Sequence, residues 1–142
     1  MPLTTDAEIA QLLCETKTIA MIGASDRPDR PSYGVMRALQ DHGYRVFPVN
    51  PSITGETVHG EFVWRELGEI GEAIDMVDIF RRDPAEAAEA VDAAIAAGAK
   101  SVWMQIGVID AVAAARAEAS GLKVVMDRCP KVELGRLGVR AA

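Results

Sequence analysis

The fold is decided by an apolar run that turns at a glycine, Thr18-Ile19-Ala20-Met21-Ile22-Gly23-Ala24-Ser25. Residues 18–22 are predicted to form a strand, and its apolar character on both faces is typical of a central strand in a parallel sheet. The pattern Thr5-Asp6-Ala7-Glu8 has the spacing of a capping box and predicts a preceding helix that runs to about Glu15. The start of the chain therefore favours an α/β domain.

Strand-like runs alternate with helical patterns along the rest of the chain. Further strands are expected at residues 44–49, 76–80, 101–106 and 122–126. The helices between them are expected to end near Gly43, Gly98 and Gly121, and Asp83 and Asp110 are expected to cap the starts of two of them. Residues 51–72 contain several glycines and are expected to hold only a short strand or a helical turn. We predict one Rossmann-like three-layer α/β/α domain over residues 1–142, with a parallel five-stranded sheet of order 3-2-1-4-5 and a short extra strand allowed for.

Composition and charge exclude several classes of function. A net charge of −6 argues against nucleic acid and anionic membranes as partners, because both are bound by broad basic surfaces. No stretch approaches the roughly 20 apolar residues of a membrane span, and the N-terminus lacks a secretory pattern, so a cytoplasmic protein is expected. Cys14 and Cys129 lack the spacing of a disulfide framework or a zinc site, so they are interpreted as thiols and no metal is expected.

The loops after the predicted strands are the expected location of a binding site, because open parallel sheets bind ligands beyond the carboxyl ends of their strands. The first such loop runs from Gly23 to a helix start near Ser32 to Gly34, where backbone N–H groups and the Ser25 hydroxyl are suited to a phosphate. Cations also follow the strand ends, namely Arg27, Arg30, Arg81, Arg82, Arg128 and Lys131. Their concentration in an acidic protein predicts a small polyanionic ligand.

The sequence lacks the fingerprint of a dinucleotide site, which combines G-x-G-x-x-G with an acidic residue about 20 positions later. Ser25 stands where the second glycine would be, and Asn50 follows the second predicted strand in place of the acid. A neutral amide accommodates a ribose that carries its own phosphate, as in coenzyme A, whereas a carboxylate repels it. This pattern weakens an assignment to NAD and leaves NADP open.

Six separated blocks of sequence resemble the small CoA-binding proteins, stand-alone relatives of the nucleotide-binding domain of the succinyl-CoA synthetase α subunit. The blocks are residues 21–25, 33–35, 43–51, 77–81, 102–107 and 125–129. The resemblance extends over about residues 5–135 and implies coenzyme A or an acyl-CoA as the ligand. The phosphorylated histidine and further domains of the larger ligases have no counterpart in this sequence.

The resemblance also implies a set of cofactor-binding residues. Gly23, Ala24 and Ser25 would line the pyrophosphate, and Phe80 and Arg81 would lie near the adenosine or its 3′-phosphate. The full expected set is Gly23, Ala24, Ser25, Arg30, Ser32, Tyr33, Gly34, Asn50, Pro51, Phe80, Arg81, Gln105, Gly107, Arg128 and Cys129.

No catalytic residue is assigned from the sequence. His42 is interpreted as the C-terminal end of a helix, and the adjacent Asp127 and Arg128 as a local ion pair rather than an acid and its orienting group. Cys129 follows Arg128 and lies near Lys131, where positive charge favours a thiolate. We consider two interpretations of Cys129: a packed cysteine at a strand end, or a thiol that exchanges disulfides with CoA.

Three functions remain open on the sequence alone. The favoured one is a non-catalytic binding or regulatory module for CoA or an acyl-CoA. The alternatives are a small NAD(P)-linked enzyme and a regulatory subunit with a vestigial nucleotide site. The sequence also leaves open a homodimer or an unknown protein partner.

Overall fold

The computed structural model describes residues 1–53 and 56–142. Its centre is a five-stranded parallel sheet in the order β2-β1-β5-β6-β7. The strands are β1 (Thr18–Ile22), β2 (Arg45–Val49), β5 (Met76–Ile79), β6 (Ser101–Met104) and β7 (Lys123–Val125). The predicted Rossmann-like α/β class and the parallel five-stranded sheet are confirmed.

The strand order differs from the predicted 3-2-1-4-5 in one respect. Counted along the chain, the five strands lie in the order 2-1-3-4-5, because β5 pairs directly with β1, with Ile22 opposite Ile79. Among the described residues, the position outside β2 holds one isolated parallel bridge, between Val49 and Trp64. The glycine-interrupted segment after β2 cannot supply a longer edge strand.

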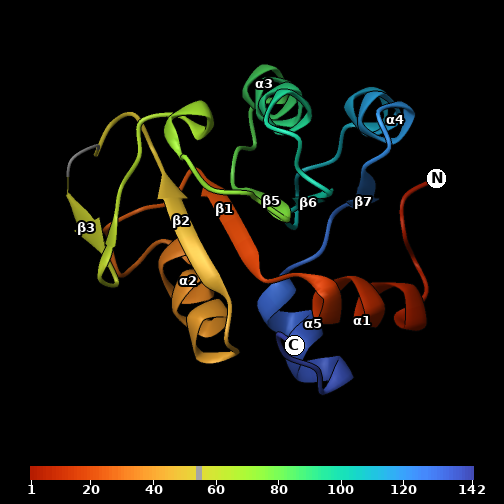
Figure 1. Ribbon diagram of the computed structural model, residues 1–142, viewed down its shortest axis with the longest axis horizontal. Helices are drawn as coiled ribbons and strands as arrows, with labels where there is room; N and C mark the ends of the chain where they lie inside the picture. Colours follow the sequence, from red (N-terminus) through yellow and green to blue (C-terminus); the bar gives the residue numbers. More distant parts are fainter. Residues whose placement is uncertain (54–55) are drawn as a thin grey trace.

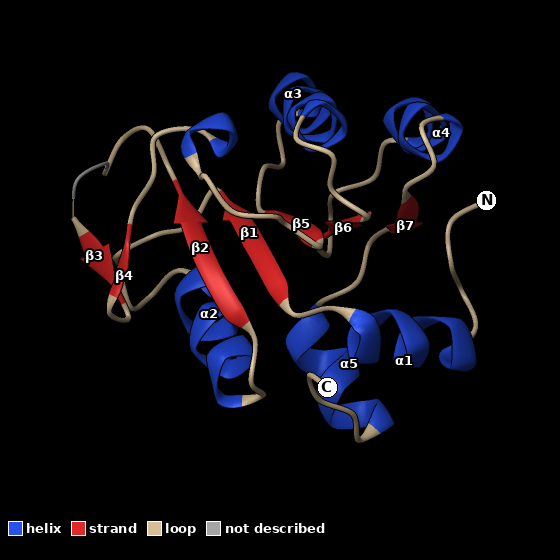
Figure 2. Cartoon of the chain, viewed as in Figure 1, coloured by secondary structure: helices blue, strands red, loops and turns tan. Residues whose placement is uncertain are grey.

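That segment instead forms a small unit beside β2. It contains the antiparallel pair β3 (Thr57–Val58) and β4 (Glu61–Phe62) and the 3₁₀ turn η1 (Leu67–Glu69), so both a short strand and a helical turn occur there (Figure 2). Gly55, one of the glycines expected to interrupt any long element in this segment, lies outside the described residues.

Helices cover both faces of the sheet. On one face lie α1 (Asp6–Glu15), α2 (Pro31–Asp41) and α5 (Pro130–Leu137), and on the other α3 (Pro84–Ala96) and α4 (Ala111–Ala119) (Figure 1). Successive strand residues alternate between the two cores, so Met76 packs on the α2 side and Val77 on the α3 side. In the described chain, no helix has the length and apolarity needed to cross a bilayer.

The predicted helix ends are largely confirmed. Thr5 and Glu8 form the capping box of α1, and the Asp83 and Asp110 carboxylates accept from the first turns of α3 and α4. His42 ends α2, with its Nδ1 atom 2.7 Å from the Ala38 carbonyl oxygen.

Helix α5 is absent from the prediction. Its sequence signals are Pro130 at the first helical position and Gly138 in the left-handed conformation after the last turn. It is short, and its buried residues include Glu133, so the apolar pattern that predicted the other helices is weak here.

An ion-pair network attaches α5 to the N-terminal segment. The buried Glu133 carboxylate contacts Arg128 at 2.6 Å and Arg136 at 3.0 Å. Arg136 also pairs with Asp6 at 2.8 Å, and Arg128 donates to the Thr4 carbonyl oxygen at 3.2 Å. The hydrogen bonds from Arg136 and Arg128 hold the pKa of Glu133 below its ordinary value.

We expect Glu133→Gln to destabilise the protein most at neutral pH. A carboxylate whose pKa is lowered by folding contributes stability above its unfolded pKa, near 4.5, and loses it as the pH falls through the lower folded value. The difference in unfolding free energy from wild type should therefore shrink on acidification. Urea unfolding between pH 3 and 7 measures this difference, and a difference independent of pH would contradict the assignment.

Candidate functional site

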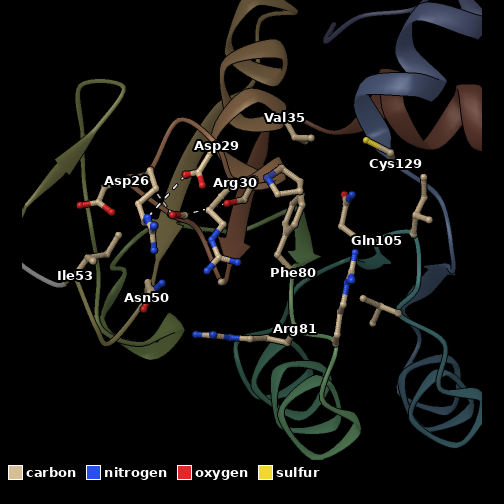
Figure 3. Close-up of a pocket in the computed structure, with 18 residues that line it drawn as sticks. Asp26, Asp29, Arg30, Val35, Asn50, Ile53, Phe80, Arg81, Gln105 and Cys129 are labelled. Atoms are coloured by element: carbon tan, nitrogen blue, oxygen red, sulfur yellow. Dashed lines mark hydrogen bonds and ion pairs between the residues drawn. The ribbon is translucent and has the colours of Figure 1, made fainter.

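The carboxyl ends of β1, β2, β5 and β6 border a cavity of about 940 Å³ (Figure 3). The β1–α2 loop and the first turn of α2 form one wall, and Cys129 at the start of α5 lies at another side. The cavity lies where β1 and β5 lead to helices on opposite faces of the sheet, the usual ligand position in open α/β folds. The volume is within the range of small-molecule sites.

Gly23 brings the first loop close to the end of β5. Its φ is +90°, and a Cβ atom at this position would lie 2.3 Å from the Phe80 carbonyl oxygen. The N–H groups of Gly23 and Ala24 both donate to the Val49 carbonyl oxygen, at 2.9 and 3.3 Å. These two amides, expected to bind phosphate, are thus occupied by β2, because the tight turn holds the loop against the sheet.

The polar side chains of this wall hold the loop in shape. Ser25 N–H donates to Ser32 Oγ at 3.0 Å, while Ser25 Oγ accepts from Arg27 N–H at 3.1 Å. Asn50 Nδ2 donates to the Ala24 carbonyl oxygen at 2.7 Å, which links the end of β2 to the loop. Within the described chain the Ser32 N–H has no hydrogen-bond partner, so it is available to a ligand at the start of α2.

Positive charge gathers at one end of the cavity. The side chains of Arg30 and Arg81 extend into the same part of it, on the side of Asn50 (Figure 3). Neither they nor Arg82 have a carboxylate within 4.0 Å in the described chain, whereas Arg27 pairs loosely with Asp29 at 3.8 Å. Unpaired guanidinium groups in a concave site favour a polyanion.

The other end of the cavity carries one cation in its described lining, Arg82, whose Nε atom would lie 3.9 Å from a Cβ atom at Gly107. This end is also bordered by Gln105, Ile106, Val108 and Cys129. The Gln105 side chain is 6% exposed, and its Oε1 atom has no hydrogen-bond partner in the described chain. A buried unpartnered carbonyl beside a cavity is suited to accept a hydrogen bond from a ligand.

The structure brings together most of the expected site residues. The cavity is lined by Gly23, Ser25, Arg30, Ser32, Asn50, Phe80, Arg81, Gln105 and Cys129. The remaining expected residues are not in its lining, namely Ala24, Tyr33, Gly34, Pro51, Gly107 and Arg128.

Each residue outside the lining has a structural explanation. Ala24 is buried in the core below the loop, and the Tyr33 ring packs against His59 with centroids 4.1 Å apart. Gly34 and Pro51 are exposed residues outside the cavity lining. Gly107 is also exposed, and its N–H donates to the Asp127 carboxylate at 2.8 Å.

The predicted local pair between Asp127 and Arg128 is wrong. Asp127 accepts from Gly107, whereas Arg128 turns toward Glu133 on α5 and away from the site. The unpredicted helix α5 supplies the buried carboxylate that draws Arg128 away. Lys131 also lies outside the cavity lining.

Some lining residues were missing from the expected site. Arg27 and Arg82 are cations that follow strand ends, but they are not among the residues predicted for the site. Several lining residues next to predicted ones in the loops are also missing from that prediction. The unassigned lining residues are Asp26, Arg27, Asp29, Pro31, Val35, Ile53, Arg82, Ile106 and Val108. These lining residues lie near predicted site residues such as Gly23, Ser32, Asn50 and Gln105 in the chain. That proximity is the sequence signal that could have identified them. Among the described residues, no cluster of histidine, cysteine and carboxylate side chains is arranged to hold a metal ion.

Comparison with known proteins places this chain in a family. Residues 17–135 match the family model described as CoA binding domain. The chain belongs to the CoA-binding domain family. This CoA-binding domain is 40% identical over 131 residues to the uncharacterized protein YneT of Bacillus subtilis (strain 168), covering 89% of this chain and 91% of YneT.

Solved structures share the same fold over nearly the whole CoA-binding domain. A hypothetical protein from Pyrococcus horikoshii OT3 is 38% identical with a TM-score of 0.89, and the match covers 96% of each chain. A protein from Thermus thermophilus is 36% identical with a TM-score of 0.88, covering 94% of this chain and 99% of the other.

Proposed function

We propose that this CoA-binding domain holds coenzyme A or an acyl-CoA in the cavity at the carboxyl edge of the sheet, as a cytoplasmic, non-catalytic binding or regulatory module. The observation that carries the proposal is the pair Arg30 and Arg81, whose unpaired guanidinium groups enter the same part of the cavity. Family membership supports CoA binding in general.

The cavity fits a ligand with one polyanionic end and one neutral arm. Arg30 and Arg81, with the free Ser32 N–H, offer donors to the pyrophosphate and the 3′-phosphate. The other end, with Gln105, Ile106 and Val108 and with Arg82 as its one cation in the described lining, is suited to the pantetheine arm. We assign direct ligand contact to the lining residues, and a supporting role to Ala24, which accepts from Asn50.

Isothermal titration calorimetry at fixed salt tests the proposal with CoA, acetyl-CoA, NAD, NADP and ATP. We expect CoA or acetyl-CoA to bind more tightly than the other three. Preferential binding of NAD or NADP would favour the nicotinamide-linked enzyme instead. Binding of none of these ligands would favour a regulatory subunit with a vestigial site.

We expect Arg81→Ala to weaken CoA more than dephospho-CoA. A charge-assisted contact with the 3′-phosphate contributes about 1.5–3 kcal/mol, so the affinity for CoA should fall by about 10- to 150-fold. Calorimetry with both ligands measures the difference, and Arg37→Ala is the matched control, since Arg37 lies outside the cavity lining and pairs with Asp41. Equal losses for both ligands would show that Arg81 does not contact the 3′-phosphate.

A further inference from the structure

We propose that Cys129 captures the ligand covalently, through a disulfide between its thiol and the thiol of the pantetheine arm. The co-reactant is the oxidised ligand, CoA disulfide. This inference rests on the proposed function, since it requires the nucleotide end to bind in the same cavity.

The Cys129 backbone is fixed from both sides. It is the N-cap residue of α5, and Glu133 N–H donates to its carbonyl oxygen at 3.0 Å. The preceding Arg128 donates its N–H to the Met104 carbonyl oxygen at 3.2 Å, and its own carbonyl accepts from Trp103 Nε1 at 2.8 Å. The thiol is therefore held in a defined position relative to the end of β6.

The Cys129 side chain lines the cavity although the residue is only 9% exposed. Its sulfur is directed toward the side of Val35 and Gln105 (Figure 3). A ligand inside the cavity thus has access to a thiol that bulk solvent reaches poorly. Cys129 should therefore react with a disulfide that first binds in the cavity rather than with one in bulk solvent.

Gln105 is the second observation that points to a ligand at this end. Its Oε1 atom is buried without a partner, and its amide extends toward the part of the cavity where Cys129 lies (Figure 3). The pantetheine arm carries amide N–H groups, which are suited to satisfy such an acceptor. An arm bound to Gln105 would bring its terminal sulfur to the end of the cavity where Cys129 lies.

Charge sets the direction of the ligand. Arg30 and Arg81 lie together on the side of Asn50, whereas the described lining at the end with Gln105 and Cys129 holds one cation, Arg82, beside Gly107. The phosphates should therefore bind at the Asn50 end and the thiol at the other. With the phosphates at Arg30 and Arg81, the sulfur arm runs toward α5. The reverse orientation would bring the phosphates to the single guanidinium group of Arg82 instead of the pair.

The reaction is a thiol–disulfide exchange. The Cys129 thiolate attacks one sulfur of CoA disulfide. A sulfur–sulfur bond forms between Cys129 and one CoA, the original disulfide bond breaks, and its electron pair leaves with the second CoA as a thiolate. The thiol proton of Cys129 goes to solvent, and a free thiol reverses the step.

The test is mass spectrometry of the full chain incubated with CoA disulfide, followed by peptide mapping. We expect an adduct on Cys129 with the mass of CoA less two hydrogen atoms, in wild type and in Cys14→Ser. Cys14 is the internal control, because it is exposed on α1 and lies outside the cavity lining. Modification of Cys129 should exceed that of Cys14 by about tenfold or more in rate, because binding positions the disulfide.

Competition by a nucleotide shows whether modification of Cys129 requires ligand binding in the cavity or reflects only the reactivity of an accessible thiol. Adenosine 3′,5′-bisphosphate, which has no thiol, should slow modification of Cys129 and leave Cys14 unaffected. Hydroxyethyl disulfide, which has no nucleotide, should react preferentially at the exposed Cys14. Equal rates at both cysteines with CoA disulfide, or no protection, would overturn the proposal.

The two proposals fail in distinguishable ways. CoA binding by calorimetry without an adduct on Cys129 would overturn the covalent step and leave the binding function intact. Absence of CoA binding would overturn both. Cys129→Ser should lose the adduct, and its thermal unfolding curve shows whether that variant is folded.

Discussion

Gly23→Ala is expected to destabilise the protein by about 3 kcal/mol or more, a large fraction of the 5–15 kcal/mol that holds a typical domain folded. The added Cβ would lie 2.3 Å from the Phe80 carbonyl oxygen, and backbone on both sides leaves little room to relax. The φ of +90° adds strain for any residue with a side chain. Urea unfolding of soluble protein, or its loss from the soluble fraction, measures the effect.

Gly34→Ala is the matched control for this prediction. Gly34 lies inside α2, and a Cβ there meets no atom within 4 Å. Alanine at a helical position should raise the unfolding free energy by about 0.4–1 kcal/mol. A Gly23→Ala protein as stable as wild type would show that the loop does not approach β5 as described.

Asp78→Asn is expected to change the pH dependence of stability. Asp78 is fully buried on β5, and neither carboxylate oxygen has a hydrogen-bond partner in the described chain. Its register neighbours are Met21 on β1 and Trp103 on β6, so no opposite charge compensates it in the sheet. Burial therefore raises the pKa of Asp78 well above 3.8, because the desolvated carboxylate is disfavoured relative to the neutral carboxyl.

The direction of the effect follows from linkage. A carboxyl whose pKa is raised by folding contributes its full stability below the unfolded value of 3.8 and loses it as the pH rises toward the folded value. Wild type should therefore lose stability relative to Asp78→Asn by up to about 1.4 kcal/mol per pH unit above pH 4.

Urea unfolding of wild type and Asp78→Asn from pH 4 to 7 measures how their difference in unfolding free energy changes with pH. Asp92→Asn is the control, because Asp92 is an exposed carboxylate on α3 that pairs with Arg116. The difference in unfolding free energy between Asp92→Asn and wild type should change much less between pH 4 and 7. A constant difference for Asp78→Asn would mean that the Asp78 carboxyl ionises in the folded protein as readily as in the unfolded one.

The elements that depend on local chemistry could be predicted from the sequence. Apolar runs such as residues 18–22 specify buried strands, and the Asp83 and Asp110 caps mark helix starts that the structure reproduces. The position of the site at the carboxyl edge also followed from the sequence, because strand direction in a parallel sheet places all these loops together.

Tertiary structure alone decided which loop groups face the cavity. Asp127 and Arg128 are adjacent, but contacts with Gly107 and Glu133, which lie elsewhere in the chain, separate them. The first loop is a second case in which the sequence did not predict the partners of polar groups. The Gly23 and Ala24 amides were expected to bind phosphate, but both donate to the carbonyl oxygen of Val49 on another strand. The chain's own spacing determined its strands and helix caps, because these depend on local chemistry, whereas tertiary contacts decided which polar groups of the loops remain free to face the cavity.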